Sequence, residues 1–227
     1  MKVLLLSLSL LLVFLPTANA LIEPEQAPDY YSLEYQTILA SQSDSLVSPQ
    51  SLRGYSFKFL DVPVYSQQQT NWCGPASTKM TIHSINGSSP SQSVLAEETD
   101  ADPKGSYVYL IERSLNKYIA GKPYKYYTIK DVNLINKSVQ SFQNGLPVIY
   151  RLKTKNLPGY GAHDTTHYVV GTGYFVAWDE TGTIRNDVWY NDPNGYRAGC
   201  LGEHIIPFST LENAVRRAGD GWFIPKK

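Results

Sequence analysis

The feature of this sequence that most restricts its fold is a change of hydrophobic period near residue 147. From Cys73 to this point apolar residues recur at the intervals typical of helices, and after it they follow strand-like patterns. The pattern predicts helices over Cys73–Ile85, Val94–Thr99, Tyr107–Ala120 and Val132–Gln143. It predicts strands over Phe57–Tyr65, Pro147–Lys153, His167–Trp178 and Ile184–Tyr190, the last two joined by a hairpin turn at Asp179–Gly182. Helices followed by an antiparallel sheet indicate an α+β fold, with the N-terminal helices packed on the sheet.

Two segments precede this pattern. The apolar run Val3–Leu15, followed by Ala18-Asn19-Ala20, predicts a signal peptide over residues 1–20. The run is too short to span a membrane, which takes roughly 20 apolar residues. Residues 21–54 are rich in serine, glutamine and proline, which indicates a linker or a pro-segment. We therefore expect a secreted protein without a stable membrane anchor, whose folded domain covers residues 55–227.

The composition excludes one class of partner. Lys and Arg together number 20 and so do Asp and Glu, so the formal net charge is zero. Nucleic-acid binding needs a cationic face for phosphate contacts, and no basic run provides one. In an exported protein the two cysteines, Cys73 and Cys200, would by default form a disulfide. This pairing remains open as an alternative to chemistry at either thiol.

Cys73 lies at the start of a predicted helix, in the sequence Asn71-Trp72-Cys73-Gly74-Pro75-Ala76. The free N–H groups and the dipole at a helix N-terminus stabilise a thiolate. The thiolate is the nucleophilic form of cysteine, so this position suits nucleophilic catalysis. Pro75 fits the first turn of the helix, where a missing N–H has no cost.

Four histidines are candidates for the base. His83 lies ten residues along the same helix, about 15 Å from Cys73, and is too distant. His167 opens a strand, where a fixed ring with an exposed tip suits a general base, and it is preferred to His163 and His204. His163 and His167 also have the His-x-x-x-His spacing of metal ligands, but no matching Glu motif follows. No metal or other cofactor is predicted.

A third group should orient the imidazole from the neighbouring strand. After the hairpin, the chain returns through Val188-Trp189-Tyr190 to Asp192, beside the start of the His167 strand. A carboxylate there can hold the ring N–H and stabilise the imidazolium. Asn191 is the neighbouring alternative, and Asp-Pro-Asn-Gly is also ordinary turn chemistry.

Several short motifs in order resemble papain-like cysteine peptidases, in particular the peptidase C39-like branch related to bacteriocin-leader peptidases. The motifs are Val62–Gln67, Asn71–Ala76, Gly145–Ile149, His167–Tyr174 and Tyr190–Pro193, within a likeness that covers roughly Asp61–Leu211. The resemblance implies a papain-like fold and a Cys73-His167-Asp192 triad. It also implies that a glutamine six residues before the cysteine, here Gln67, donates a hydrogen bond to the oxyanion. Gln68 and Gln69 follow directly, so a shifted register stays open.

The motifs and the resemblance together predict a secreted cysteine hydrolase. It would act on peptide or related amide bonds of a peptide or protein substrate through a thioester, and acyl transfer or deamidation would use the same groups. The alternative is a catalytically silent binding protein on the same fold, with Cys73 and Cys200 joined in a disulfide.

Overall fold

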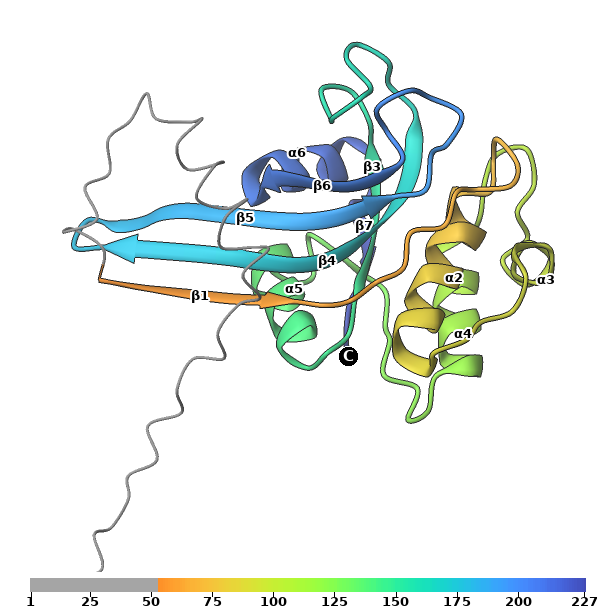
Figure 1. Ribbon diagram of the computed structural model, residues 1–227, viewed down its shortest axis with the longest axis horizontal. Helices are drawn as coiled ribbons and strands as arrows, with labels where there is room; N and C mark the ends of the chain where they lie inside the picture. The colour runs from red at the N-terminus through yellow and green to blue at the C-terminus, as the bar shows by residue number, and fades with distance from the viewer. Residues whose placement is uncertain (1–52) are drawn as a thin grey trace, which may run out of the picture. The chain divides into compact units, whose positions relative to one another are not determined.

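The computed structural model describes residues 53–227, and Figure 1 shows the arrangement of their helices and strands. The predicted signal peptide and all of the predicted linker except its last two residues lie outside the described residues. The helices are α2 (Cys73–Asn86), α3 (Gln92–Glu98), α4 (Val108–Tyr118), α5 (Leu134–Gln143) and α6 (Phe208–Arg217). The strands are β1 (Gly54–Phe59), β2 (Tyr127–Thr128), β3 (Val148–Lys153), β4 (Thr166–Asp179), β5 (Gly182–Asp192), β6 (Gly202–Pro207) and β7 (Trp222–Ile224). Within residues 53–227, no helix is both long enough and apolar enough to cross a membrane.

The strands of residues 53–227 belong to one antiparallel sheet, in the order β2-β7-β3-β4-β5-β6, with β1 also paired to β4. Strand β4 organises the sheet because three strands pair with it. Along one edge β3 pairs with its first half and β1 with its second half, while β5 follows the other edge. The predicted α+β class, with N-terminal helices and a later antiparallel sheet, is confirmed.

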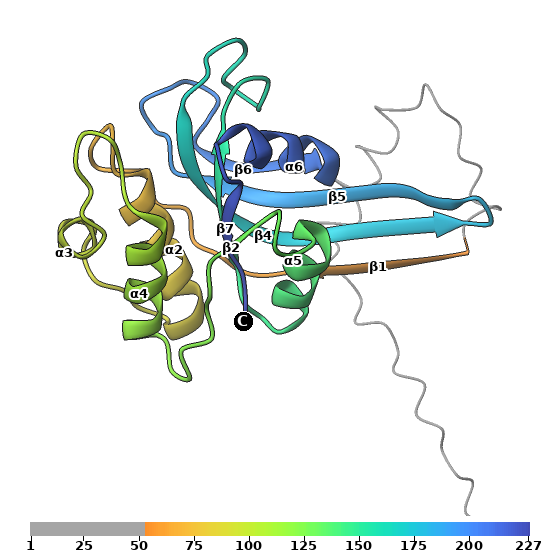
Figure 2. The ribbon, with the colours of Figure 1, turned by 180° about the vertical axis from the view of Figure 1, so that it is seen from behind.

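The sheet separates two hydrophobic cores near the start of β4. Side chains of successive strand residues point to opposite faces. Accordingly Val148, Tyr150 and Leu152 of β3 join the core under α5 and α6, whereas Ile149 joins the core under α2 and α4. Figure 2, seen from behind, shows α2, α3 and α4 grouped beside one end of the sheet. This placement brings the N-terminus of α2 close to the first residues of β4.

Helix α2 begins at Cys73, as predicted, and ends at Asn86, one residue beyond the predicted Ile85. Cys73 is its first residue, Pro75 lies in its first turn, and no side chain caps its N-terminus. At the other end Gly87 adopts φ 70°, and its N–H donates to the carbonyl of His83 at 2.8 Å. This left-handed cap favours glycine, because a side chain there would meet the following carbonyl.

Four elements differ from the predictions. The first strand ends at Phe59 and does not continue to Tyr65, because β3 occupies the same edge of β4 from Gly171 back to Thr166. Helix α6 and the short strands β2 and β7 were not predicted. The predicted hairpin turn is confirmed: the Thr181 N–H donates to Asp179 Oδ1 at 2.7 Å, and Gly182 takes φ 126°.

Candidate active site

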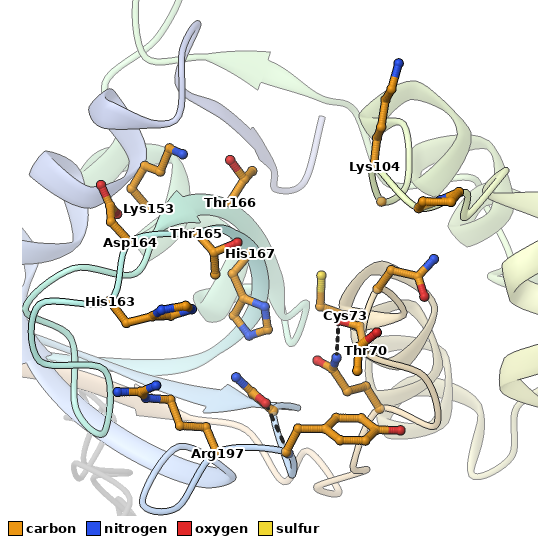
Figure 3. Close-up of a pocket in the computed structure, with 16 residues that line it drawn as sticks. Thr70, Cys73, Lys104, Lys153, His163, Asp164, Thr165, Thr166, His167 and Arg197 are labelled. Carbon is orange, nitrogen blue, oxygen red and sulfur yellow. Dashed lines mark hydrogen bonds between the residues drawn. The ribbon is translucent and has the colours of Figure 1, made fainter.

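A polar cleft of about 580 Å³ lies between the N-terminus of α2 and the first residues of β4. Figure 3 shows Thr70, Cys73 and Lys104 on the helical side, and Lys153, His163, His167 and Arg197 on the sheet side. Cys73, His167 and Gln67, each predicted from the sequence, line this one cleft. Asp192 lies directly behind His167.

Cys73 is 7% exposed and faces the His167 ring across the cleft. Burial by itself would raise the pKa of the thiol, and it is the largest single influence. The charge and hydrogen bond of His167, together with backbone hydrogen bonds from Tyr168 and Gly74, outweigh burial and hold the pKa of Cys73 below its usual value. The thiolate is therefore favoured at this position.

His167 is the second residue of β4 and is 4% exposed. Its Nε2 lies 2.8 Å from Asp192 Oδ1, so the other ring nitrogen, Nδ1, is the one available to Cys73. Burial opposes the positive charge, but Asp192 and the Cys73 thiolate outweigh it and raise the pKa of His167 to about 10. The lowered pKa of Cys73 and the raised pKa of His167 both favour a thiolate–imidazolium pair over the neutral thiol and imidazole.

Asp192 ends β5 and is fully buried. Besides His167, its carboxylate accepts the Asn194 N–H at 2.8 Å and the Tyr160 hydroxyl at 3.0 Å. These hydrogen bonds stabilise the buried carboxylate of Asp192 and fix its orientation. The alternation of the strand turns Asn191 the other way, where its Nδ2 donates to the Val62 carbonyl at 2.8 Å. The geometry thus selects Asp192 over Asn191 as the partner of the imidazole.

Gln67 lines the cleft, but its side chain is engaged locally. Its Nε2 donates to the carbonyls of Gln69 and Thr70, both at 2.9 Å. Its Oε1 is buried and has no hydrogen-bond partner among residues 53–227. The Gln67 N–H donates to the Pro193 carbonyl at 2.8 Å, which ties this loop to the turn after Asp192. Gln68 and Gln69 are exposed and do not line the cleft.

The other three histidines are not paired with Cys73. His83 Nδ1 is bonded to the Tyr65 hydroxyl at 2.6 Å, and His204 Nε2 to the Cys200 carbonyl at 2.6 Å. His163 lines the cleft, where its ring stacks on Tyr160 with centroids 6.4 Å apart. No group of three or more His, Cys, Asp and Glu side chains gathers as a metal site anywhere in the described part of the chain.

The two cysteines are both free and buried, so the alternative disulfide is not formed. Cys73 belongs to the core under α2, and Cys200 to the core under α5 and α6 on the other side of the sheet. Burial and the nearby Asp192 charge raise the pKa of Cys200, which keeps this second thiol protonated.

Sequence reasoning missed Tyr160 and Asn194, which support Asp192. The Asn194 Nδ2 also donates to the Tyr160 hydroxyl at 3.0 Å, so the two side chains form one network with the carboxylate. Asn194 was visible only as part of a turn motif. Tyr160 lies in an irregular loop, where neither periodicity nor spacing marks it.

A buried thiol at a helix start, facing an imidazole on an antiparallel sheet, is the arrangement of papain-like cysteine peptidases. The chain belongs to the Peptidase C39-like family, whose family model matches residues 59–219, more than two thirds of the chain. No curated protein matches the sequence.

Solved structures provide more distant likenesses. The peptidase domain of Streptococcus ComA, a bifunctional ABC transporter, shares 16% identity with a TM-score of 0.47, covering 73% of this chain and 98% of that one. A double-glycine motif protease from an AMS/PCAT transporter shares 16% identity with a TM-score of 0.41, covering 75% and 94%. The bromelain protease from Ananas comosus shares 14% identity with a TM-score of 0.48, covering 74% and 94%. The family assignment rests on the family model and not on these structures.

Proposed function

We propose that this protein is a secreted thiol hydrolase that cleaves peptide or related amide bonds, with Cys73 as nucleophile, His167 as general base and acid, and Asp192 orienting His167. The observation that carries the proposal is the alignment of the Cys73 thiol, which faces the His167 ring, with the buried His167–Asp192 pair. Export is proposed from the apolar run Val3–Leu15 and the small residues that follow it.

The reaction follows from the protonation states. The Cys73 thiolate attacks the substrate carbonyl carbon, and the carbonyl π electrons move onto oxygen. When the intermediate collapses, the C–N bond breaks and the His167 imidazolium gives its proton to the leaving amine, which leaves a thioester. His167 then takes a proton from water, the hydroxide attacks the thioester, and the acid product departs as the thiolate returns. If an amine replaces water in the second half, the same groups carry out acyl transfer.

The developing oxyanion needs donors beside Cys73. The first N–H groups of a helix have no partner within it, and the earliest α2 donor with a backbone partner is the Ala76 N–H, bonded to the Trp72 carbonyl. The Cys73 N–H is therefore one proposed donor. The side-chain amide of Gln67 is the second proposed donor. Its Nε2 now donates to two loop carbonyls, and it would keep or break one of these hydrogen bonds as it donates to the oxyanion.

The thioester provides a direct test of the proposal. Quenching a reaction with acid during turnover should leave the acyl part of the substrate attached to the peptide that contains Cys73, and hydroxylamine should remove it. Mass spectrometry of the digested protein measures both steps. Turnover with no acyl group on Cys73, or with an acyl group on a different residue, would overturn the assignment.

Replacing Gln67 by alanine is expected to lower kcat/KM by roughly 10²- to 10³-fold, the range for loss of one oxyanion donor. The loss should be far smaller than that of Cys73→Ala, because backbone donation remains. Gln69→Ala is the matched control, since Gln69 is exposed and only its backbone carbonyl contacts Gln67. Full activity of Gln67→Ala, with a loss in Gln69→Ala or Gln68→Ala, would move the role to that neighbour.

A further inference from the structure

Cationic side chains gather on the sheet side of the cleft. Lys153 and Arg197 line it. Two further cationic residues lie close by in the fold: Lys155, two residues after Lys153, and Arg217, whose Nη2 donates to the Lys155 backbone carbonyl at 2.9 Å. We call Lys153, Lys155, Arg197 and Arg217 the basic rim. Figure 3 shows Lys153 and Arg197 on the same side of the cleft as His167.

The charge of the basic rim is not balanced locally. The ion pairs formed within residues 53–227 include none of its four cations. Asp164, whose Oδ1 accepts the Lys155 N–H at 3.2 Å, is the single carboxylate among the described residues that line the cleft. Because the whole chain carries equal numbers of cations and anions, the excess at this rim is a local feature. A cleft with an excess of one sign of charge attracts ligands of the opposite sign.

Arg197 is the cation that the structure fixes most firmly. Its Nε donates to the Gly159 carbonyl at 2.8 Å and its Nη2 to the Tyr160 carbonyl at 3.2 Å. Its guanidinium carbon also lies 6.0 Å from the centroid of the Tyr160 ring. The centroid of the same ring lies 5.9 Å from the centroid of the His167 ring. The Tyr160 ring therefore contacts both the guanidinium of Arg197 and the imidazole of His167. A guanidinium held in place retains N–H groups suited to a carboxylate.

We propose that the cleft takes acidic peptides, with side-chain carboxylates near the scissile bond bound by the basic rim. The inference rests on the proposed function and names its substrate class. One source of an acidic peptide is the chain itself, because residues 21–52 contain five Asp and Glu residues and no Lys or Arg. The other source is a separate acidic peptide, and both would use the same recognition.

The test measures binding and not cleavage, so it is independent of whether the protein turns over. The protein is the chain from Leu21 with Cys73→Ala. A second form also carries amides in place of the five carboxylates of residues 21–52. The probes are two fluorescent Gly/Ser peptides, one with Glu and one with Gln at the same positions. Fluorescence anisotropy gives the Kd of each peptide for each of the two protein forms.

The Glu peptide should bind the amide form at least about tenfold more tightly than the Gln peptide at low salt, and the difference should shrink as salt screens the charges. The double variant Lys153→Gln/Lys155→Gln should remove most of this preference, whereas Lys130→Gln, an exposed lysine that does not line the cleft, should leave it intact. If the Glu peptide binds more weakly to the form that keeps the five carboxylates than to the amide form, residues 21–52 are a ligand in cis. Equal binding of the Glu peptide to the two forms would favour separate peptides. The proposal would be overturned if the Glu and Gln peptides bound both forms with equal affinity. It would also be overturned if Lys130→Gln reduced the preference for the Glu peptide as much as Lys153→Gln/Lys155→Gln does. Absence of peptidase activity would instead refute the proposed function and leave the binding result unchanged.

Discussion

Replacing Cys73 by alanine is expected to leave a folded protein whose turnover is lower by about 10⁴-fold or more, the scale seen when a catalytic nucleophile is removed. The residual rate would come from substrate binding and backbone donors alone. Folding should survive, because the substitution removes one sulfur atom from the wall of a cleft that is already open. Thermal unfolding followed by circular dichroism, together with the rate of peptide cleavage, measures the two effects separately.

Cys200→Ala is the matched control, since it removes the second buried thiol without touching the cleft. Because Cys200 is fully buried in the core under α5 and α6, this variant should lose about 1 kcal/mol of stability through the small cavity. Cys200→Ala should keep its peptidase activity at temperatures at which the variant remains folded. Retained turnover in Cys73→Ala, or a greater loss in Cys200→Ala, would refute Cys73 as nucleophile.

The second large effect is expected for Asp192→Asn, which keeps the shape of the side chain and removes its charge. The carboxylate stabilises the buried His167 imidazolium, and that imidazolium in turn lowers the pKa of Cys73. Loss of the charge should therefore lower the pKa of His167 and raise that of Cys73, so the reactive ion pair forms over a narrower pH range. We expect kcat/KM to fall on the order of 10²- to 10⁴-fold, the upper figure being that of the corresponding exchange in a serine-protease triad.

The pH profile distinguishes this electrostatic effect from simple damage to the fold. In Asp192→Asn the acidic limb of kcat/KM should move to higher pH and the alkaline limb to lower pH. Asp164→Asn is the control, because Asp164 lines the same cleft but accepts the Lys155 N–H, whereas His167 is paired with Asp192. A uniform loss of rate with unmoved limbs, or the same shift in Asp164→Asn, would contradict the role of Asp192.

Much of the fold could be predicted because its signals are local. Helix α2 has a proline in its first turn and glycine after its last residue, and the β4–β5 hairpin has an Asp-Glu-Thr-Gly turn. The pairing of β4 with β5 then places the end of one strand beside the start of the other. The contact between His167 and Asp192 follows from this register, so spacing along the chain was sufficient to suggest it.

Other features depend on contacts that no local pattern encodes. Strand β7 has three residues and forms by pairing with β2 and β3, which are distant in sequence. Tyr160 supports Asp192 from an irregular loop, and the orientation of the Gln67 amide depends on two loop carbonyls. Helix α6 does carry a helical pattern, with Phe208, Leu211, Ala214 and Val215 buried, but it is short and follows a strand directly.

The state of the two cysteines illustrates the same limit. The proposed export and the even number of cysteines would favour a disulfide, and only the three-dimensional arrangement shows Cys73 and Cys200 in different cores. Their environments differ as well, since His167 lowers the pKa of one thiol while burial and Asp192 raise that of the other.

The central claim, that Cys73 is held as a thiolate by His167, is tested most directly by the rate of alkylation with iodoacetamide as a function of pH. The protein is purified without reductant, and peptide mapping by mass reports each cysteine separately, so Cys200 is an internal reference. We predict rapid modification of Cys73 near about pH 6, where an ordinary thiol is almost fully protonated, with Cys200 slow throughout. Cys73 that reacts only as pH approaches the usual thiol pKa, or that is recovered in a disulfide with Cys200, would contradict the account.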